Sequence, residues 1–366
     1  MQFAVLGIVP MVLFSFSDII RPEAMRAFFT DKLSLGYVSY QRLESPVNYE
    51  MSLYKNPKRY VNIDSNLQSG FADGGNILLV EAENVALLAE DFKAMDYSLP
   101  AVKSGKIDVP RISLQDVPAG FNDIPDVNAK KALFIKSMLP MVLIANENLM
   151  YHHQKLDALS QLSAQASGTS WNKGLSFYEQ TWAETQFTRY KVALGDWEAL
   201  KMRVGAVPVS LALAQAAIES GWGGSRFAQQ GNALFGQWIW GNDNAGIVPE
   251  ARSDDQTHSI RKFETPYDAI AAYMHNLNTH PAYEDFRIAR LNFYESQHDH
   301  ITGDQAFQSV LMGLDSYSEK GLEYIDLLNI VINQNSLKTL ESAKLESAAA
   351  NLFSAFYRNN FLRNNS

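Results

Sequence analysis

Apolar residues at helical spacing dominate the chain from Asn128 onward. They recur from Asn128 to about Leu162, from Leu175 to Leu200 and from Thr302 to Gln334. Spacings near 3.6 residues indicate amphipathic helices that bury one face. Between these segments lies a compact alanine-rich stretch, Val207–Ser220, whose small side chains favour close packing of a helix against its neighbours. These patterns predict a mainly helical protein.

A polar, turn-rich stretch interrupts the helical pattern. Residues 239–263 contain Gly, Asn, Asp and Pro, and they end in a β-like run at His258–Phe263. Helical periodicity returns at Pro266. Turn residues followed by an extended run are typical of a small β element. The expected fold class is therefore mainly α (α+β), with one small β-lobe.

The chain before residue 127 has a different character. Residues 45–125 hold six of the thirteen prolines. Proline lacks a backbone donor and is disfavoured inside helices and central strands. The stretch therefore predicts an irregular, proline-rich arm or a small accessory layer, in which only Ile77–Val80 is strand-like and Val85–Phe92 is typical of a short helix.

The N-terminus carries a signal for location. Residues Phe3–Phe16 are apolar or small throughout. This run is shorter than the roughly 20 residues that span a bilayer, and it matches the apolar region of a secretory signal, although no Lys or Arg precedes it. We expect export, with the segment either cleaved or kept as a short membrane anchor. The alternative is a buried N-terminal strand or helix.

Four regions follow from these patterns. The last of them, from Leu337 to Tyr357, has apolar residues on one side of a predicted amphipathic helix. We predict a signal peptide or short membrane anchor at 1–20, an extended accessory region at 21–126, the main domain at 127–335, and a C-terminal amphipathic helix and tail at 336–366.

Composition excludes several classes of function. None of the 366 residues is cysteine, so disulfides, thiol nucleophiles and thiolate metal sites are ruled out. Lys and Arg number 31 against 40 Asp and Glu, a net charge of −9, which argues against nucleic acid as a partner. The pairs His152–His153 and His298–His300 have no third ligand nearby in the sequence. We predict no metal and no cofactor.

The candidate chemistry lies at the end of the alanine-rich segment. Glu219 is followed at once by Ser220, Gly221, Trp222, Gly223 and Gly224, and the glycines end the helix and allow close approach of a ligand. A carboxylate at a helix C-terminus faces the negative end of the dipole, and Trp222 can shield it from water. Both effects raise the pKa of Glu219. A glycosidase needs such an acid to protonate the leaving oxygen. The alternative is a helix-ending glutamate that points into water.

Three motifs around this glutamate resemble one family of enzymes. They are AQAAIESGWGGSRFA, GNALFGQW and KFETPYDAIAAYMHNLNTHPAY, in that order. Together they resemble the glucosaminidase domain of glycoside hydrolase family 73, and most of all its Bax-type envelope proteins of Gram-negative bacteria. The segments KKALFIKSMLPMVLIANENL and YSEKGLEYI also fit, so the resemblance spans about Val127–Asn335.

The resemblance implies a fold, a reaction and a location. The fold would be lysozyme-like, with a helical body and a small β-lobe across a sugar-binding groove. The activity would be that of a peptidoglycan hydrolase, an endo-β-N-acetylglucosaminidase that cleaves the β-1,4 bond after N-acetylglucosamine. The partner would be the glycan strands of peptidoglycan in the periplasm or cell envelope. The sequence carries no signal for an oligomeric state.

The resemblance also assigns roles to individual residues. Glu219 stands at the position of the general acid. The second carboxylate is expected in the β-lobe, where the spacing to Phe263 favours Glu250, with Asp254 and Asp255 as alternatives. It would serve as a base for water or support attack by the substrate's acetamido group. The expected substrate-binding residues are Trp222, Asn232, Phe235, Gly236, Tyr273 and Tyr283.

Two other functions stay open at this level. A lytic transglycosylase shares the lysozyme-like fold and a Glu-Ser pair, but typically continues into a G-L-M-Q type motif where this chain has NALFGQW. A non-catalytic peptidoglycan-binding protein would hold glycan without cutting it. The cleavage products distinguish a transglycosylase from a hydrolase. Loss of glycan cleavage in Glu219→Gln, with glycan binding kept, would distinguish a hydrolase from a binding protein.

Overall fold

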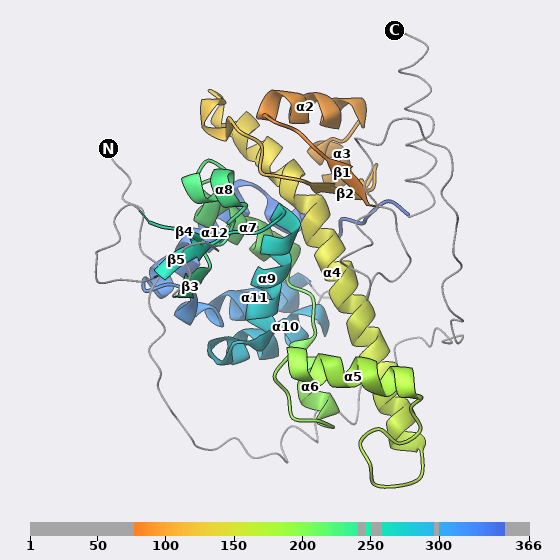
Figure 1. Cartoon of the computed structure of the whole chain (residues 1–366). Helices are drawn as coiled ribbons and strands as arrows, with labels where there is room; N and C mark the ends of the chain where they lie inside the picture. Colours follow the sequence, from red (N-terminus) through yellow and green to blue (C-terminus); the bar gives the residue numbers. More distant parts are fainter. Residues whose placement is uncertain (1–76, 241–245, 250–257, 296–299, 348–366) are drawn as a thin grey trace, which may run out of the picture. The chain divides into compact units, whose positions relative to one another are not determined.

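The computed structural model describes residues 77–240, 246–249, 258–295 and 300–347, all of which lie in the compact unit Lys58–Ser366 (Figure 1). The predicted signal or anchor at 1–20 and the chain after residue 347 fall outside the described residues.

The longest described element is α4, Val127–Gln165. It begins after Asp126, whose side chain accepts hydrogen bonds from the backbone N–H groups of Asn128 and Ala129. Helices α7 (Val209–Ser220) and α9 (Pro266–Thr279) pack against it (Figure 1). Of the helices that the structure describes, α4 alone is long and apolar enough to cross a membrane. Because 67% of its apolar window is buried in the protein, it is typical of a core helix.

The remaining helices pack around this centre or extend from it. Figure 1 shows α5 and α6 at one end of α4, where they bury a separate aromatic cluster that includes Phe187 and Tyr190. Helix α12 packs on α7, and α10 packs on α11. The bounds are α5 Phe177–Arg189, α6 Trp197–Arg203, α8 Arg226–Gly231, α10 Glu284–Glu295, α11 His300–Met312 and α12 Leu322–Gln334.

The predicted β-lobe is a three-stranded antiparallel sheet. Its strands are β3 (Trp238–Trp240), β4 (Gly246–Ile247) and β5 (His258–Arg261), in the spatial order β3-β5-β4. Trp238 pairs with Ile260 and Trp240 with His258. The expected class, mainly α with a small β element, is confirmed.

Where the structure describes it, the proline-rich region forms a small layer, the second of the two predicted forms, and not an irregular arm. Strands β1 (Leu78–Val80) and β2 (Ile112–Leu114) form a parallel pair, and α2 (Val85–Ala94) and α3 (Leu99–Lys103) lie between them in sequence. Figure 1 shows this layer beside the first half of α4. Its apolar side chains belong to the main hydrophobic core. The described part of this region, from residue 77 on, is therefore an integral layer.

This layer also supports the turn that follows Glu219. Asn122 Nδ2 donates to the carbonyl of Gly224 over 2.7 Å. Gly223 has a φ of 77°, and a Cβ added there would lie 2.9 Å from Cδ2 of the buried Phe121. The position therefore needs glycine both for its left-handed backbone and for the space that Phe121 occupies.

Gly223→Ala is therefore expected to destabilise the protein by about 1–3 kcal/mol. The substitution adds a strained φ and a clash with an aromatic ring packed in the core. Gly105→Ala is the matched control, since Gly105 also has a positive φ (69°) but has no atom within 4 Å of an added Cβ. Chemical denaturation measures the free energy of unfolding of both variants, and the difference between their losses gives the contribution of the clash with Phe121. Equal losses in the two variants would show that Phe121 does not constrain Gly223.

The end of the described chain also differs from its prediction. Leu337–Leu340 form a short 3-10 helix in place of the start of an α-helix. The chain then passes Glu341, and Leu345 forms an isolated parallel bridge with Val109. Backbone bonds on both sides of this bridge join Val109 to Lys344 and Glu346. Residues 344–346 therefore form backbone hydrogen bonds with Val109 where a helix would form them within the segment.

Candidate active site

Glu219 lies at the penultimate position of α7, and the turn after it is closed by its neighbour. Ser220 is fully buried, donates from Oγ to the carbonyl of Ala216 over 2.6 Å and accepts from the backbone N–H of Gly223 at 2.9 Å. Gly221, Trp222 and Gly223 then follow with φ values of 58°, 59° and 77°. This run of left-handed residues ends the helix directly after the glutamate.

A chain of three hydrogen bonds leads to the Glu219 carboxyl. Tyr273 Oη donates to Gln215 Oε1 at 2.5 Å, Gln215 Nε2 donates to Tyr324 Oη at 3.0 Å, and Tyr324 Oη donates to Glu219 Oε1 at 2.9 Å. Gln215 and Glu219 are four residues apart on α7 and so lie on one helical face. Glu219 itself is half-buried, and no described residue hydrogen-bonds its Oε2.

Burial raises the pKa of Glu219 to about 7, and the hydrogen bond from Tyr324 opposes part of that rise. Burial penalises the carboxylate because a charge loses water, whereas Tyr324 favours the charged form by donating to it. A carboxyl group with this pKa is partly protonated near neutral pH. It can give a proton to a bound substrate and take one back.

Three tyrosine rings adjoin one another near this carboxyl. Tyr317 stacks on Tyr324 with ring centroids 5.5 Å apart, and the Tyr283 ring centroid lies 6.0 Å from that of Tyr317. Burial raises the pKa of Tyr283 to about 12, and the charge of Glu219 adds to the rise. The phenols therefore stay protonated and act as hydrogen-bond donors or apolar walls around Glu219.

Two predicted substrate-binding residues lie beneath the site. Phe235 and Tyr273 stack face to face, with ring centroids 3.9 Å apart and an angle of 2° between the rings. Phe235 is 3% exposed and Tyr273 is 1% exposed. The Tyr273 hydroxyl is bonded to Gln215, and Phe235 stacks on Tyr273. Both residues therefore support the site from inside the protein.

Asn232 is likewise bonded within the protein. It ends α8 with a φ of 53°, and its Oδ1 accepts from the backbone N–H of Val117 at 2.9 Å. Its Nδ2 donates to Asp116 Oδ1 at 3.0 Å and to the carbonyl of Glu264 at 3.1 Å. The buried amide thus connects three segments that are distant in sequence, where we had expected a substrate contact.

Trp222 and Gly236 are the remaining predicted substrate-binding residues of the two motifs around Asn232 and Phe235. Trp222 packs edge-on against Phe134 of α4 with centroids 5.8 Å apart, and the Lys131 ammonium lies 5.1 Å from its ring centroid. The ring is half-buried. Gly236 has a φ of 58° and precedes strand β3. Stacking of Trp222 on a sugar stays a prediction.

The expected second carboxylate, Glu250, lies outside the described residues, as do its alternatives Asp254 and Asp255. In the part of the chain that the structure does describe, no cluster of three or more His, Asp or Glu side chains is placed to hold a metal ion.

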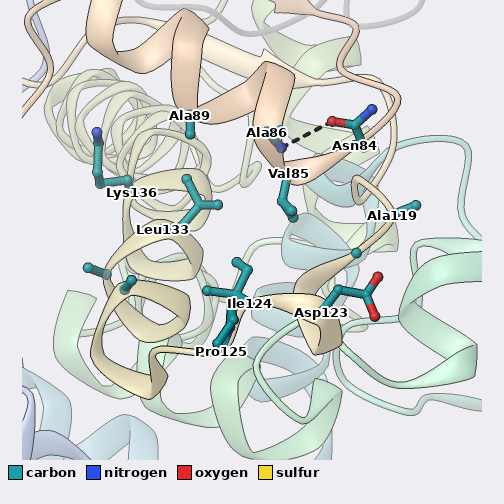
Figure 2. A pocket seen from close by; sticks show the side chains of 13 residues that line it. Asn84, Val85, Ala86, Ala89, Ala119, Asp123, Ile124, Pro125, Leu133 and Lys136 are labelled. Carbon is teal, nitrogen blue, oxygen red and sulfur yellow. Dashed lines mark hydrogen bonds between the residues drawn. The ribbon is translucent and has the colours of Figure 1, made fainter.

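A pocket of about 660 Å³ lies apart from this carboxyl, between α2, α4 and the loop at residues 119–125 (Figure 2). Its wall is mostly apolar, and Figure 2 shows Val85, Ile124 and Leu133 facing the opening. Neither Glu219 nor any of its tyrosines contributes to it. The pocket is therefore separate from the candidate site.

Sequence reasoning overlooked Gln215, Tyr317 and Tyr324. The two tyrosines are the aromatic positions of YSEKGLEYI, a segment that we had matched to the family without giving it a role. The signal for Gln215 is its place four residues before Glu219, as a polar side chain inside an otherwise apolar helix.

Comparison with known proteins agrees with the resemblance seen in the sequence. Residues 196–337 match the model of the glucosaminidase family, described as mannosyl-glycoprotein endo-beta-N-acetylglucosaminidase. Protein bax of Escherichia coli (strain K12) is 27% identical over 217 residues, which is 58% of this chain and 72% of that protein.

Two solved structures also align with part of the chain. The catalytic domain of the autolysin Auto from Listeria monocytogenes is 17% identical, with 51% of this chain and 95% of that chain covered and a TM-score of 0.25. The glycoside hydrolase domain of FlgJ from Salmonella typhimurium is 20% identical, with 50% and 98% covered and a TM-score of 0.24. At such scores neither superposition adds evidence on the fold.

Proposed function

Because residues 196–337 match the glucosaminidase family model, we propose that the protein is a peptidoglycan hydrolase in which Glu219 is the general acid. The reaction would be that of an endo-β-N-acetylglucosaminidase, cleaving the β-1,4 bond after N-acetylglucosamine. The observation that carries the assignment is the half-buried Glu219 carboxyl, whose pKa is raised to about 7. A glycosidase uses an acid of this kind to protonate the leaving oxygen.

The geometry suggests how the proton would move. Oε1 accepts from Tyr324 and faces the protein, whereas Oε2 has no partner among the described residues. In the proposed reaction, Oε2–H gives its proton to the glycosidic oxygen as the bond to the anomeric carbon breaks. The Tyr324 hydrogen bond then stabilises the carboxylate that remains. Tyr283 and Tyr317 would border the sugar bound at this point.

The second carboxylate completes the proposal. Glu250, or Asp254 or Asp255 in its place, would activate water from the opposite side of the sugar or support attack by the acetamido group. Delivery to the envelope would depend on the apolar segment Phe3–Phe16, which we propose as an export signal or anchor.

Mass spectrometry of digested peptidoglycan tests the reaction. Wild-type protein is expected to release soluble fragments with N-acetylglucosamine at the reducing end, and Glu219→Gln is expected to release them about 10²- to 10⁴-fold more slowly. Anhydro-muramic ends would instead assign the protein to the lytic transglycosylases. If neither protein releases fragments but both bind insoluble peptidoglycan, the protein is a binding module and the hydrolase proposal is wrong.

A further inference from the structure

We propose that Gln215 is a positioning residue, which keeps the acid proton of Glu219 on Oε2, where a substrate can take it. The inference rests on the proposed function, since it concerns the same carboxyl. It explains why a fully buried amide stands on α7 in an otherwise apolar stretch, bonded to tyrosines of two other helices.

The first step is the single proton of Tyr324. The oxygen of Tyr324 accepts from Gln215 Nε2 at 3.0 Å, so that side of the hydroxyl is occupied by a donor. Among the described residues, the one acceptor that the Tyr324 hydroxyl reaches is Glu219 Oε1, 2.9 Å away, so the Tyr324 proton is directed there. A proton on Oε1 would face this donor, so the acid form of Glu219 carries its proton on Oε2.

The second step is the orientation of the Gln215 amide. Tyr273 is 1% exposed, and among the described residues its hydroxyl donates only to Gln215 Oε1. A flipped amide would turn its NH₂ toward Tyr273 and leave that buried phenol proton without an acceptor, which is unfavourable. It would also turn its oxygen toward Tyr324 and draw the proton of Tyr324 away from Glu219. Tyr273 thereby fixes the direction of the whole chain of hydrogen bonds.

The consequence for catalysis is a change in which oxygen of Glu219 carries the acid proton. Without the Gln215 donor, the Tyr324 oxygen is free to accept a hydrogen bond from a protonated Glu219. The acid proton then occupies Oε1 for part of the time and points into the protein. Substrate binding does not involve Gln215, because the side chain is 0% exposed. The effect therefore falls on the chemical step alone.

The experiment compares Gln215→Met, which preserves length and removes the donor, with Asn146→Leu as a matched control. Asn146 is another buried amide, bonded to both backbone groups of Val207 over 2.7 and 2.9 Å, and it has no bond to the Glu219 chain. For Gln215→Met we expect kcat to fall about tenfold to hundredfold with KM unchanged, and the alkaline limb of the pH profile to move upward. Asn146→Leu is expected to lower thermal stability and leave kcat and the pH profile unchanged.

Tyr273→Phe is the second variant, should Gln215→Met fail to fold. It removes one hydroxyl and frees the amide to flip, so a smaller fall in kcat with the same unchanged KM is expected. Wild-type kcat and pH profile in either folded variant would overturn the inference. If Glu219→Gln itself remained active, the general acid would lie elsewhere and the proposed function would fail first. An inactive Glu219→Gln together with wild-type kinetics for Gln215→Met would refute the positioning role alone.

Discussion

Glu219→Gln is expected to lower the rate of glycan cleavage by about 10²- to 10⁴-fold while leaving glycan binding intact. The amide has the size of the acid and its oxygen still accepts the Tyr324 hydrogen bond, so the local geometry is kept. What is lost is the acidic proton at the second position of the group. Release of soluble fragments measures the rate, and co-sedimentation with insoluble peptidoglycan measures the binding.

Glu323→Gln is the matched control, because Glu323 is an exposed glutamate on α12 directly beside Tyr324 in sequence. This variant is expected to cleave at the wild-type rate. A Glu219→Gln variant that also cleaves at that rate would contradict the role of Glu219 as the acid.

The same carboxyl fixes the direction of the pH dependence. Burial raises the pKa of Glu219 from its ordinary 4.5 to about 7, and the reaction needs the protonated form. Activity is therefore expected to fall as the pH rises through about 7, along the alkaline limb of the kcat profile. An alkaline limb near 4.5 would show that Glu219 is not shielded from water.

The raised pKa also affects stability. Because the folded-state pKa of Glu219 exceeds its unfolded value, the folded protein binds the extra proton between these two values. Stability is thus lost as the pH rises from 4.5 through about 7, by up to about 3 kcal/mol. Glu219→Gln removes this loss and is expected to unfold at a higher temperature than wild type at pH 8. Thermal melts at that pH would then show that its inactivity does not arise from unfolding.

Local patterns were sufficient to predict much of this arrangement. The alanine-rich helix, the glycines that end it and the turn-rich β-lobe each depend on residues adjacent in sequence, and the candidate acid Glu219 lies among them. For the proline-rich region, the irregular arm was the wrong one of the two predicted forms, and the reason is physical. Pro100, for example, lies in the first turn of α3, where the missing N–H breaks no helical bond. A high proline content is therefore compatible with the first turns of helices as well as with irregular chain.

The partners of Glu219 could not be predicted in the same way. Tyr324 lies 105 residues further along the chain, and Tyr273 reaches Gln215 across a separation of 58 residues. Helical spacing shows which face of a segment is apolar, and it does not show which other segment meets that face. Family likeness had assigned Tyr273 to the cleft, whereas its stacking on Phe235 buries it below the carboxyl.

Loss of the C-terminal segment from Leu337 is expected to unfold the domain, because the segment carries the half-buried Glu341. Glu341 lies at the start of α7, where Pro208 provides no side-chain cap. Its carboxylate accepts from the backbone N–H groups of Val209 and Ser210, at 3.0 and 2.8 Å, and from the Ser210 hydroxyl at 2.5 Å. A negative charge at this end also complements the helix dipole. The segment therefore caps the helix whose other end carries Glu219.

Glu341→Ala alone is expected to cost about 3–5 kcal/mol, because it leaves three buried donors without an acceptor. Urea denaturation measures this loss, and Glu319→Ala is the control, since Glu319 is an exposed glutamate in the turn before α12. A deletion from Leu337 should not fold. If this deletion instead folds and cleaves glycan faster, the segment is a removable cover. The helix that presents Glu219 would then need no cap from Glu341.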